Sequence, residues 1–244
     1  MKLDAFLNFL GKTSRTLFAP RLSRALLLHG VLAGAEHRRV LARELGTVVD
    51  IGANKGQFAL AVRQWAPRAR LIAFEPLAGP ANIFRRVFAG DKRVALHQAA
   101  IGPAPARQLM HVSAREDSSS LLPIAAAQVA MFPGTQEKTT VEVRVATLDE
   151  WLTAADLAAP ALLKLDVQGY ELDALIGCEP LLPNFDWVYC ECSYVEFYTG
   201  QKLAGDVADW LAAKGFQPAG TFNRSYDRAG NTVQADFLFR RAAP

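Results

Sequence analysis

Short apolar runs that alternate with helical patterns constrain the fold of this chain more than any other feature of its sequence. Runs at 47–51, 70–74 and 94–101 read as buried strands, and Phe58 and Trp65 belong to a helical stripe between the first two. A β-α-β-α-β succession requires parallel strands that are joined by right-handed crossovers. The sequence therefore predicts an α/β fold that is built on a parallel sheet.

The C-terminal part of the chain resumes this alternation of strands and helices and then ends in two strand patterns without a helix between them. Apolar runs at 161–167 and 187–192 are typical of core strands, and each is followed by a helical pattern. The last two runs, 216–222 and 233–240, flank the turn-forming segment 227–231 and indicate an antiparallel hairpin. We expect one twisted, mostly parallel, seven-stranded Rossmann-like sheet with an antiparallel C-terminal hairpin and helices on both faces.

Residues 102–146 interrupt this rhythm. The segments 108–112 and 141–145 alternate like half-exposed strands, and the stretch between them is rich in Ser, Ala, Gly and Pro. We predict an inserted antiparallel hairpin with a mobile loop, in which 117–120 would form a lid. The main domain would then run from residue 46 to residue 244, with residues 1–45 as a basic helical extension.

Charge is distributed unevenly between these two parts. The net charge is +3, but residues 1–46 carry eight basic and three acidic side chains, against 19 and 21 in the remainder. A nearly neutral body argues against a nucleic-acid partner. Apolar residues among the N-terminal charges leave two alternatives open, a peripheral contact with an anionic membrane or a surface helix pair that packs on the domain or contributes to a homodimer. These apolar residues are Phe6, Leu7, Leu10, Leu17 and Leu22.

Cysteine content and hydropathy suggest where the protein works. Cys178, Cys190 and Cys192 are too few for a disulfide framework and lack the spacing of a zinc site, so we interpret them as core thiols. No stretch approaches the roughly 20 apolar residues that a membrane span requires. We therefore expect a soluble, cytoplasmic protein.

The residues that follow the predicted strands carry the chemistry, because parallel α/β sheets bind ligands at the carboxyl ends of their strands. Gly52 and Gly56 permit a tight turn whose backbone N–H groups face a ligand. Asp50 precedes this turn, and it would repel a pyrophosphate but attract a ligand that carries an ammonium and a sulfonium group. Asn54 also replaces the middle glycine of the dinucleotide fingerprint, so a dinucleotide-dependent oxidoreductase is disfavoured.

Glu75 ends the second predicted strand, 25 residues after Asp50. A carboxylate at this position can accept hydrogen bonds from both hydroxyl groups of a ribose. A helix cap for Asp50 and a solvated loop acid for Glu75 are the structural alternatives. Two acids at successive strand ends favour a nucleoside-binding pair.

Four segments together resemble the FkbM family of S-adenosylmethionine (SAM)-dependent methyltransferases: Val49–Phe58, Ala73–Pro76, Thr147–Asp149 and Leu163–Glu171. They occur in the order of the family, over about residues 46–220, and the Lys-x-Asp-x-x-Gly-x-Glu segment from Lys164 is the most specific of them. The resemblance implies a class I methyltransferase fold with SAM as cofactor. It further implies methyl transfer to a hydroxyl group of a sugar, glycan or natural-product small molecule.

The same resemblance assigns cofactor contacts to residues of this chain. The turn after the first strand would hold the methionine portion, Glu75 the ribose and the end of the third strand the adenine, while the Ser-Ser-Leu stretch would lie near the cofactor or the acceptor. The expected cofactor-binding residues are Asp50, Gly52, Ala53, Asn54, Gly56, Phe58, Glu75, Pro76, Ala99, Ala100, Ser119 and Asp166.

Asp166 and Glu191 end neighbouring strands and would converge on the acceptor side. Asp166 could bind the SAM ammonium, orient the acceptor, act as general base or, together with Glu191, bind Mg²⁺. Structural alternatives are an ion pair for Glu191 and simple charge neutralisation for Lys164. His111 on the inserted hairpin is a third catalytic candidate. An N-methyltransferase and a non-catalytic partner subunit remain alternatives.

Overall fold

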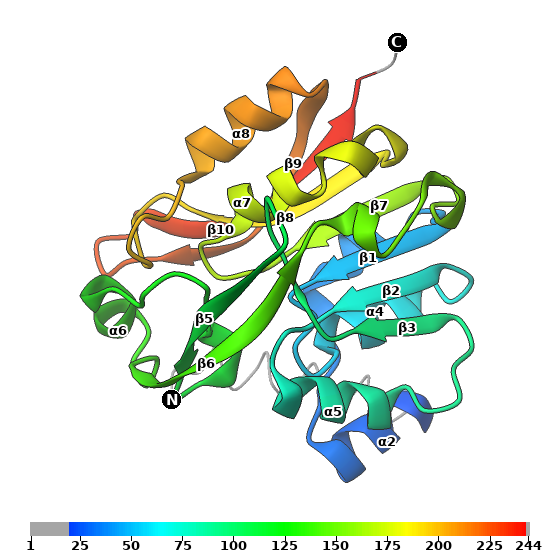
Figure 1. Cartoon of the computed structure of the whole chain (residues 1–244), viewed down its shortest axis with the longest axis horizontal. Helices are drawn as coiled ribbons and strands as arrows, with labels where there is room; N and C mark the ends of the chain where they lie inside the picture. Colours follow the sequence, from blue (N-terminus) through cyan, green and yellow to red (C-terminus); the bar gives the residue numbers. More distant parts are fainter. Residues whose placement is uncertain (1–19, 243–244) are drawn as a thin grey trace.

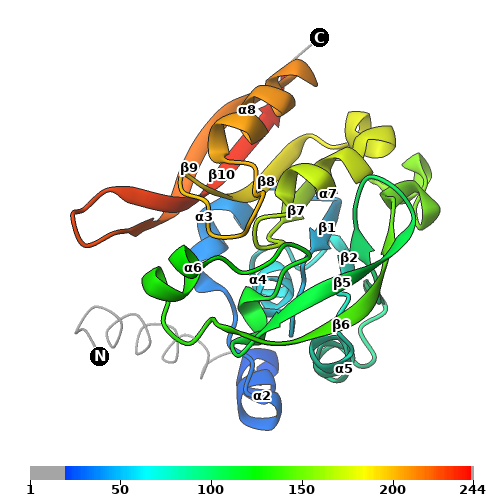
Figure 2. The same ribbon diagram turned by 60° about the vertical axis from the view of Figure 1, so that its left-hand side comes forward.

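The computed structural model describes residues 20–242 and contains one large twisted sheet (Figure 1). Five neighbouring strands of this sheet run parallel, and the two strands at one edge each pair antiparallel with the strand before them. In spatial order the strands are β3 (Val94–His97), β2 (Arg70–Phe74), β1 (Thr47–Ile51), β7 (Ala161–Leu165), β8 (Trp187–Ser193), β10 (Thr232–Arg241) and β9 (Phe216–Tyr226). The predicted fold class is confirmed, and the β9–β10 hairpin extends beyond the body of the sheet (Figure 2).

Two layers of helices cover the sheet because successive residues of a strand point to opposite faces. Val48 and Leu162 pack against one layer, whereas their neighbours Val49 and Leu163 pack against the other. The first layer contains α2 (Pro20–His29), α3 (Arg38–Leu41), α4 (Gln57–Trp65) and α5 (Ala78–Val87). The second contains α7 (Glu171–Gly177), α8 (Ala204–Ala213) and the short helices η3 (Leu148–Glu150) and η5 (Glu179–Asn184).

The apolar run at 94–101 does not form a single strand, so that prediction was wrong. β3 ends at His97, and the chain then leaves the main sheet to form β4 (Ala100–Ile101) in a second sheet. A continuous apolar run shows that residues are buried, but it does not show in which sheet they are buried.

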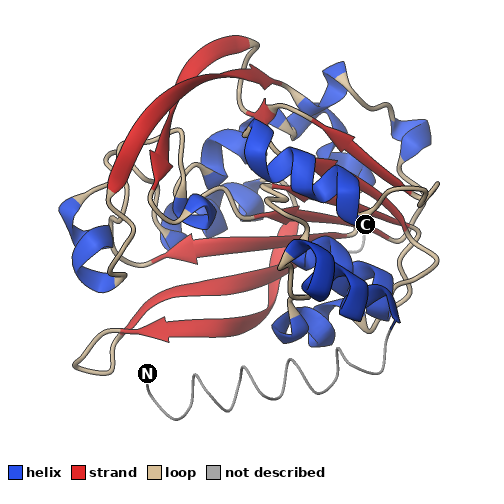
Figure 3. Cartoon of the chain, turned by 90° about the horizontal axis from the view of Figure 1, so that it is seen from below, coloured by secondary structure: helices blue, strands red, loops and turns tan. Residues whose placement is uncertain are grey.

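The inserted segment supplies the rest of the second sheet. β5 (Ala106–Ser113) pairs antiparallel with β6 (Glu137–Ala146), as the alternation at 108–112 and 141–145 predicted. This pair arches away from the main sheet (Figure 3). The connection between its strands contains η2 (Glu116–Ser118) and α6 (Ala126–Met131).

The described part of the N-terminal extension packs on the domain. Leu22 and Ala25 of α2 are buried in the same core as Phe84 and Phe88. The other residues of the predicted membrane-contacting pattern, Phe6, Leu7, Leu10 and Leu17, lie outside the described residues. Within residues 20–242, no helix combines the length and the apolar character that a membrane span needs.

Candidate active site

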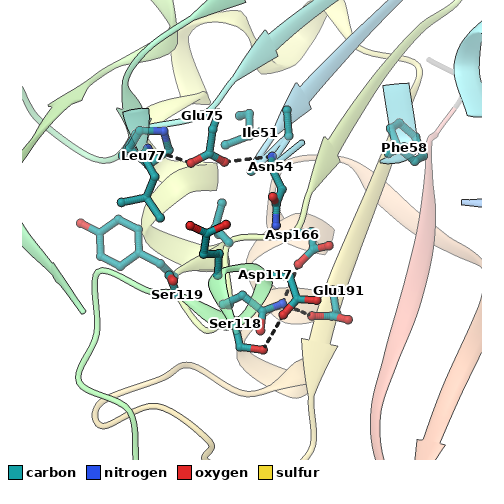
Figure 4. A pocket seen from close by; sticks show the side chains of 18 of the residues that line it. Ile51, Asn54, Phe58, Glu75, Leu77, Asp117, Ser118, Ser119, Asp166 and Glu191 are labelled. Carbon is teal, nitrogen blue, oxygen red and sulfur yellow. Dashed lines mark hydrogen bonds between the residues drawn. The ribbon is translucent and has the colours of Figure 1, made fainter. Parts of the chain in front are cut away.

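A cavity of about 360 Å³ lies at the carboxyl ends of the central parallel strands. Its walls come from the segments that follow β1, β2 and β7, from Glu191 of β8, from β4 and from the segment around η2. Asp166 and Glu191 lie next to each other in this cavity, and Glu75 lies apart from them (Figure 4). The parallel topology brings these acids together although they are far apart in the sequence.

The turn after β1 depends on its glycines. Gly52 has a φ of 81°, and a Cβ at this position would overlap the carbonyl oxygen of Asp166. Gly56 has a φ of 99° at the start of α4, and a Cβ there would come within 2.7 Å of the Phe88 ring. Gly52 lines the cavity, whereas Gly56 does not. Gly56 therefore serves the packing of α4 and α5.

Glu75 is held by the main chain. Its Oε2 accepts the N–H of Asn54 at 2.9 Å and its Oε1 accepts the N–H of Leu77 at 2.8 Å (Figure 4). Burial raises the pKa of Glu75 to about 7, although the two backbone hydrogen bonds act in the opposite direction. Because a carboxylate oxygen can accept more than one hydrogen bond, Glu75 still has lone pairs for a ligand.

Asn54 offers a second group to a ligand. Its Oδ1 is buried and has no hydrogen-bond partner among residues 20–242, and the residue lines the cavity. A buried polar atom without a partner is unfavourable, so this oxygen indicates a ligand that carries a hydrogen-bond donor.

The structure corrects the predicted position of Asp50. This residue is fully buried, does not line the cavity and forms an ion pair of 3.0 Å with Nζ of Lys164. Burial alone would lower the pKa of Lys164, but the carboxylates of Asp50 and Asp166 outweigh burial and raise it. Asp50 therefore keeps the ammonium group of Lys164 charged at the cavity wall.

Lys164 connects this buried pair to the cavity. Besides Asp50, its Nζ lies 3.3 Å from the carbonyl oxygen of Gly52 and 3.7 Å from Oδ2 of Asp166. It also lies 5.3 Å from the ring centre of Phe58, which lines the cavity. The structure thus supports the neutralising role of Lys164 that the sequence left open.

Gln168, which the sequence analysis did not single out, bridges Asp166 and Glu191. Its Nε2 donates to Oδ1 of Asp166 at 2.7 Å and to Oε2 of Glu191 at 2.8 Å, and its Oε1 accepts from the hydroxyl of Tyr198 at 2.8 Å. Its φ of 55° turns the backbone directly after Asp166. The sequence signal that could have identified Gln168 was its position as a polar residue two places after Asp166, the acid that follows the strand.

This arrangement does not fit a Mg²⁺ ion between Asp166 and Glu191. The amide NH₂ group of Gln168 already lies between the two carboxyl groups and satisfies them as a donor. Within residues 20–242, no group of three or more His, Cys, Asp or Glu side chains could hold a metal ion.

Burial and the charges of Asp166 and Asp236 raise the pKa of Glu191 well above its usual value. Glu191 thus keeps its proton at a higher pH than an exposed glutamate does.

His111 lies outside the cavity, contrary to the catalytic prediction. Its Nδ1 is 2.6 Å from Oε2 of Glu137 on the neighbouring strand β6. Because successive side chains of β5 point to opposite faces, the side chain of His111 lies on the face of the β5–β6 pair that also carries Glu137.

The other predicted cofactor residues line the cavity: Ala53, Phe58, Pro76, Ala99, Ala100, Ser119 and Asp166. Glu36 and His37 also line it, and the sequence analysis missed both because they belong to the N-terminal extension. The hydroxyl of Tyr198, 2.8 Å from Oε1 of Gln168, also lies 3.1 Å from the carbonyl oxygen of Ser118, so the segment around η2 lies beside this network.

A parallel sheet with a glycine-rich turn after β1, an acid after β2 and a cavity at these strand ends defines the class I, Rossmann-like methyltransferase fold. The chain belongs to the FkbM methyltransferase family, because residues 50–218 match the Methyltransferase FkbM domain.

Two curated proteins are similar to this chain. It is 28% identical over 213 residues to the 2-O-methyltransferase NoeI of Sinorhizobium fredii (strain NBRC 101917 / NGR234), with 84% of each chain covered. It is 27% identical over 188 residues to Methyltransferase 1 of Beauveria bassiana (strain ARSEF 2860), with 70% of this chain and 72% of that protein covered.

Among solved structures, the O-methyltransferase NcsB1 from neocarzinostatin biosynthesis, in complex with S-adenosyl-L-homocysteine and 1,4-dihydroxy-2-naphthoic acid, aligns with a TM-score of 0.44 and 12% identity. The alignment covers 81% of this chain and 50% of NcsB1.

Proposed function

We propose that this chain binds SAM and transfers its methyl group to a hydroxyl oxygen of a small molecule, such as a sugar, a glycan or a natural product. Membership of the FkbM family and the similarity to a 2-O-methyltransferase support this proposal. The observation that carries it is Glu75, a cavity-lining carboxylate at the end of β2 that main-chain donors hold in place.

The residues around the cavity fit this cofactor. Glu75 would accept hydrogen bonds from the ribose hydroxyl groups, and Oδ1 of Asn54 would accept one from the ammonium group of the methionine portion. Ala99, Ala100 and Ile101 are buried at the cavity wall and would contact the adenine. Bound SAM supplies a methyl group that its sulfonium already activates, so the chain mainly has to align the acceptor and exclude water.

The acceptor would bind beside Asp166, Gln168 and Glu191. These side chains present oxygen and amide groups to the cavity, and such groups suit an acceptor that carries several hydroxyl groups. Holding the reacting oxygen in line with the methyl group can lower the activation barrier by about 7–11 kcal/mol when the reactants are well oriented.

The proposal can be tested in two stages on the full chain. Calorimetry should detect binding of SAM to the unaltered protein and its loss in Glu75→Ala, while Glu142→Ala, a change on the exposed face of β6 outside the cavity, should bind like the parent. Equal binding by parent and Glu75→Ala would refute the assigned cofactor site.

In the second stage, SAM with an isotopically labelled methyl group is incubated with a panel of monosaccharides, oligosaccharides and phenolic compounds. Mass spectrometry and NMR then identify the labelled product. A methyl ether would support the proposal. A methylated nitrogen would replace it with N-methylation, and SAM binding without transfer to any compound would favour a non-catalytic partner.

A further inference from the structure

We propose that His37 is the general base that takes the proton of the acceptor hydroxyl group, an inference that rests on the proposed O-methylation. His37 precedes the matched family domain of residues 50–218. The base would thus come from the N-terminal extension, which the family resemblance does not cover.

His37 lies at the wall of the cavity. It ends the short helix η1 (Ala35–His37), and its side chain is 16% exposed. Its ring contacts Phe58 edge to face, with 5.0 Å between the ring centres, and both residues line the cavity. The imidazole is therefore fixed by packing and still accessible from the cavity.

A buried hydrogen-bond chain fixes which ring nitrogen carries the proton. The hydroxyl of Tyr189 has one proton, which it donates to Oδ2 of Asp236 at 2.7 Å. Nδ2 of Asn223 donates to the same oxygen at 2.6 Å, so Oδ2 of Asp236 acts as an acceptor for both neighbours. The oxygen of Tyr189, 3.0 Å from Nδ1 of His37, must then accept a hydrogen bond from that nitrogen.

This chain leaves Nε2 of His37 with a free lone pair. Nε2 forms no hydrogen bond with any residue of the described range 20–242, and Oε1 of Glu36, which also lines the cavity, is 3.9 Å away. A fixed tautomer with one unprotonated nitrogen next to a substrate cavity is the arrangement that general-base catalysis requires.

Burial of the ring favours this neutral form of His37. Burial lowers the pKa of His37, and Lys164 also lowers it, while Asp236, Glu36 and Asp166 act in the opposite direction. These charged groups come from η1, β7, β10 and the turn after β7, and the remaining ring contacts of His37 are Phe58 of α4 and Tyr189 of β8.

The two acids of the acceptor side are less suited to this role. Oδ1 of Asp166 accepts a hydrogen bond from Gln168, and its Oδ2 faces Lys164 at 3.7 Å. Burial and the neighbouring carboxylates raise the pKa of Glu191, which favours the protonated form that donates a hydrogen bond over the ionised form that could remove a proton. These acids would bind the acceptor, and His37 would deprotonate it.

The step is balanced without a further reactant. The acceptor oxygen forms a bond to the methyl carbon, the bond between that carbon and sulfur breaks, and its electron pair stays on sulfur. The hydroxyl proton moves to Nε2 of His37. The positive charge that leaves the sulfur is thereby replaced by a charge on the imidazolium, which later loses its proton to solvent.

His37→Asn tests this role with the smallest change, because the amide of asparagine can still donate to Tyr189 as Nδ1 does. We expect kcat to fall by about 10²–10⁴-fold, the usual contribution of a general base. The acceptor is whichever panel compound the unaltered enzyme methylates, while SAM affinity by calorimetry and the melting temperature should stay near those of the parent. His29→Asn, the same substitution in α2 outside the cavity, should leave kcat unchanged. An unchanged kcat in His37→Asn would overturn the inference.

A second measurement does not depend on turnover. Nitrogen NMR of the imidazole in the full chain with SAM should show His37 protonated at Nδ1 only, with a titration midpoint below the ordinary value of 6.5. The kcat of the parent should decline as the pH falls through that midpoint. Protonation at Nε2 near neutral pH would overturn the assignment even if no panel compound is methylated. Failure of the parent to bind SAM would instead refute the proposed function.

Discussion

The two ends of the cavity hold their acids in different ways. At the end of β2, two main-chain N–H groups hold Glu75. At the ends of β7 and β8, a single side chain, Gln168, holds both Asp166 and Glu191. Side-chain substitutions can therefore change the end with Asp166 and Glu191, the proposed acceptor end, whereas the end with Glu75, the proposed cofactor end, changes only if the backbone of the turn moves.

This difference suggests that backbone groups define the cofactor contacts and side chains define the acceptor contacts. A nucleoside cofactor is the same in every reaction, so its contacts can be built into the backbone of the fold. An acceptor differs between enzymes, and a network of side chains can change with it. The following predictions test this difference, from the largest expected effect to the smallest.

Lys164 lines the cavity between Asp50 and Asp166, and its loss should have the largest effect. Lys164→Met leaves the carboxylate of Asp50 buried without a counter-charge, and removing one partner of a buried ion pair costs about 3–5 kcal/mol. Urea unfolding would measure the loss. Lys214→Met, which breaks an exposed ion pair with Glu179, should cost less than ~1 kcal/mol. Similar losses in both variants would contradict the proposed importance of the buried pair.

Glu75→Gln should weaken SAM binding by about 100-fold or more. Either orientation of the glutamine amide turns its NH₂ group toward the N–H of Asn54 or Leu77, so the turn loses an acceptor as well as the charge. The loss of two charge-assisted hydrogen bonds, each worth about 1.5–3 kcal/mol, sets this scale. Calorimetry would measure the affinity, with Glu142→Gln as the control. An affinity within threefold of the parent would show that main-chain donors do not define the cofactor end.

The affinity for SAM should depend on pH through the same residue. The pKa of Glu75 is raised to about 7, so the protonated fraction of its carboxyl group grows as the pH falls through 7. Protonation removes the negative charge that strengthens hydrogen bonds from the ribose. SAM affinity should therefore fall below pH 7, by at most about tenfold per pH unit. Calorimetry at pH 6 and pH 8 would show this, and Glu75→Gln should lack most of the dependence.

Gln168→Leu should have the smallest effect and act only at the acceptor end. Removing the amide leaves Asp166 and Glu191 facing each other without a bridging donor, which should lower turnover by about tenfold, or ~1.4 kcal/mol. SAM affinity should stay within threefold of the parent. A loss of SAM affinity as large as that of Glu75→Gln would show that the two ends are not independent.

Much of the cofactor end could be predicted from the sequence. The glycine-rich turn and the acid after the second strand are local patterns, and parallel topology then places both at one edge of the sheet. Asp50 shows the limit of this reasoning, because a strand-end acid can point toward a ligand or into the core. In the structure, Asp50 and Lys164 occupy partnered positions of β1 and β7, so their side chains meet.

The sequence by itself determined the order of strands and helices in the main sheet, the antiparallel C-terminal hairpin and the strand-end segments that carry part of the cavity wall, because local periodicity and turn chemistry encode them. The tertiary structure alone decided three other features. It divided the apolar run 94–101 between two sheets, it placed Gln168 between two acids, and it brought His37 from the N-terminal extension to the cavity wall. These depend on contacts between residues far apart in the chain, and no local pattern specifies such contacts.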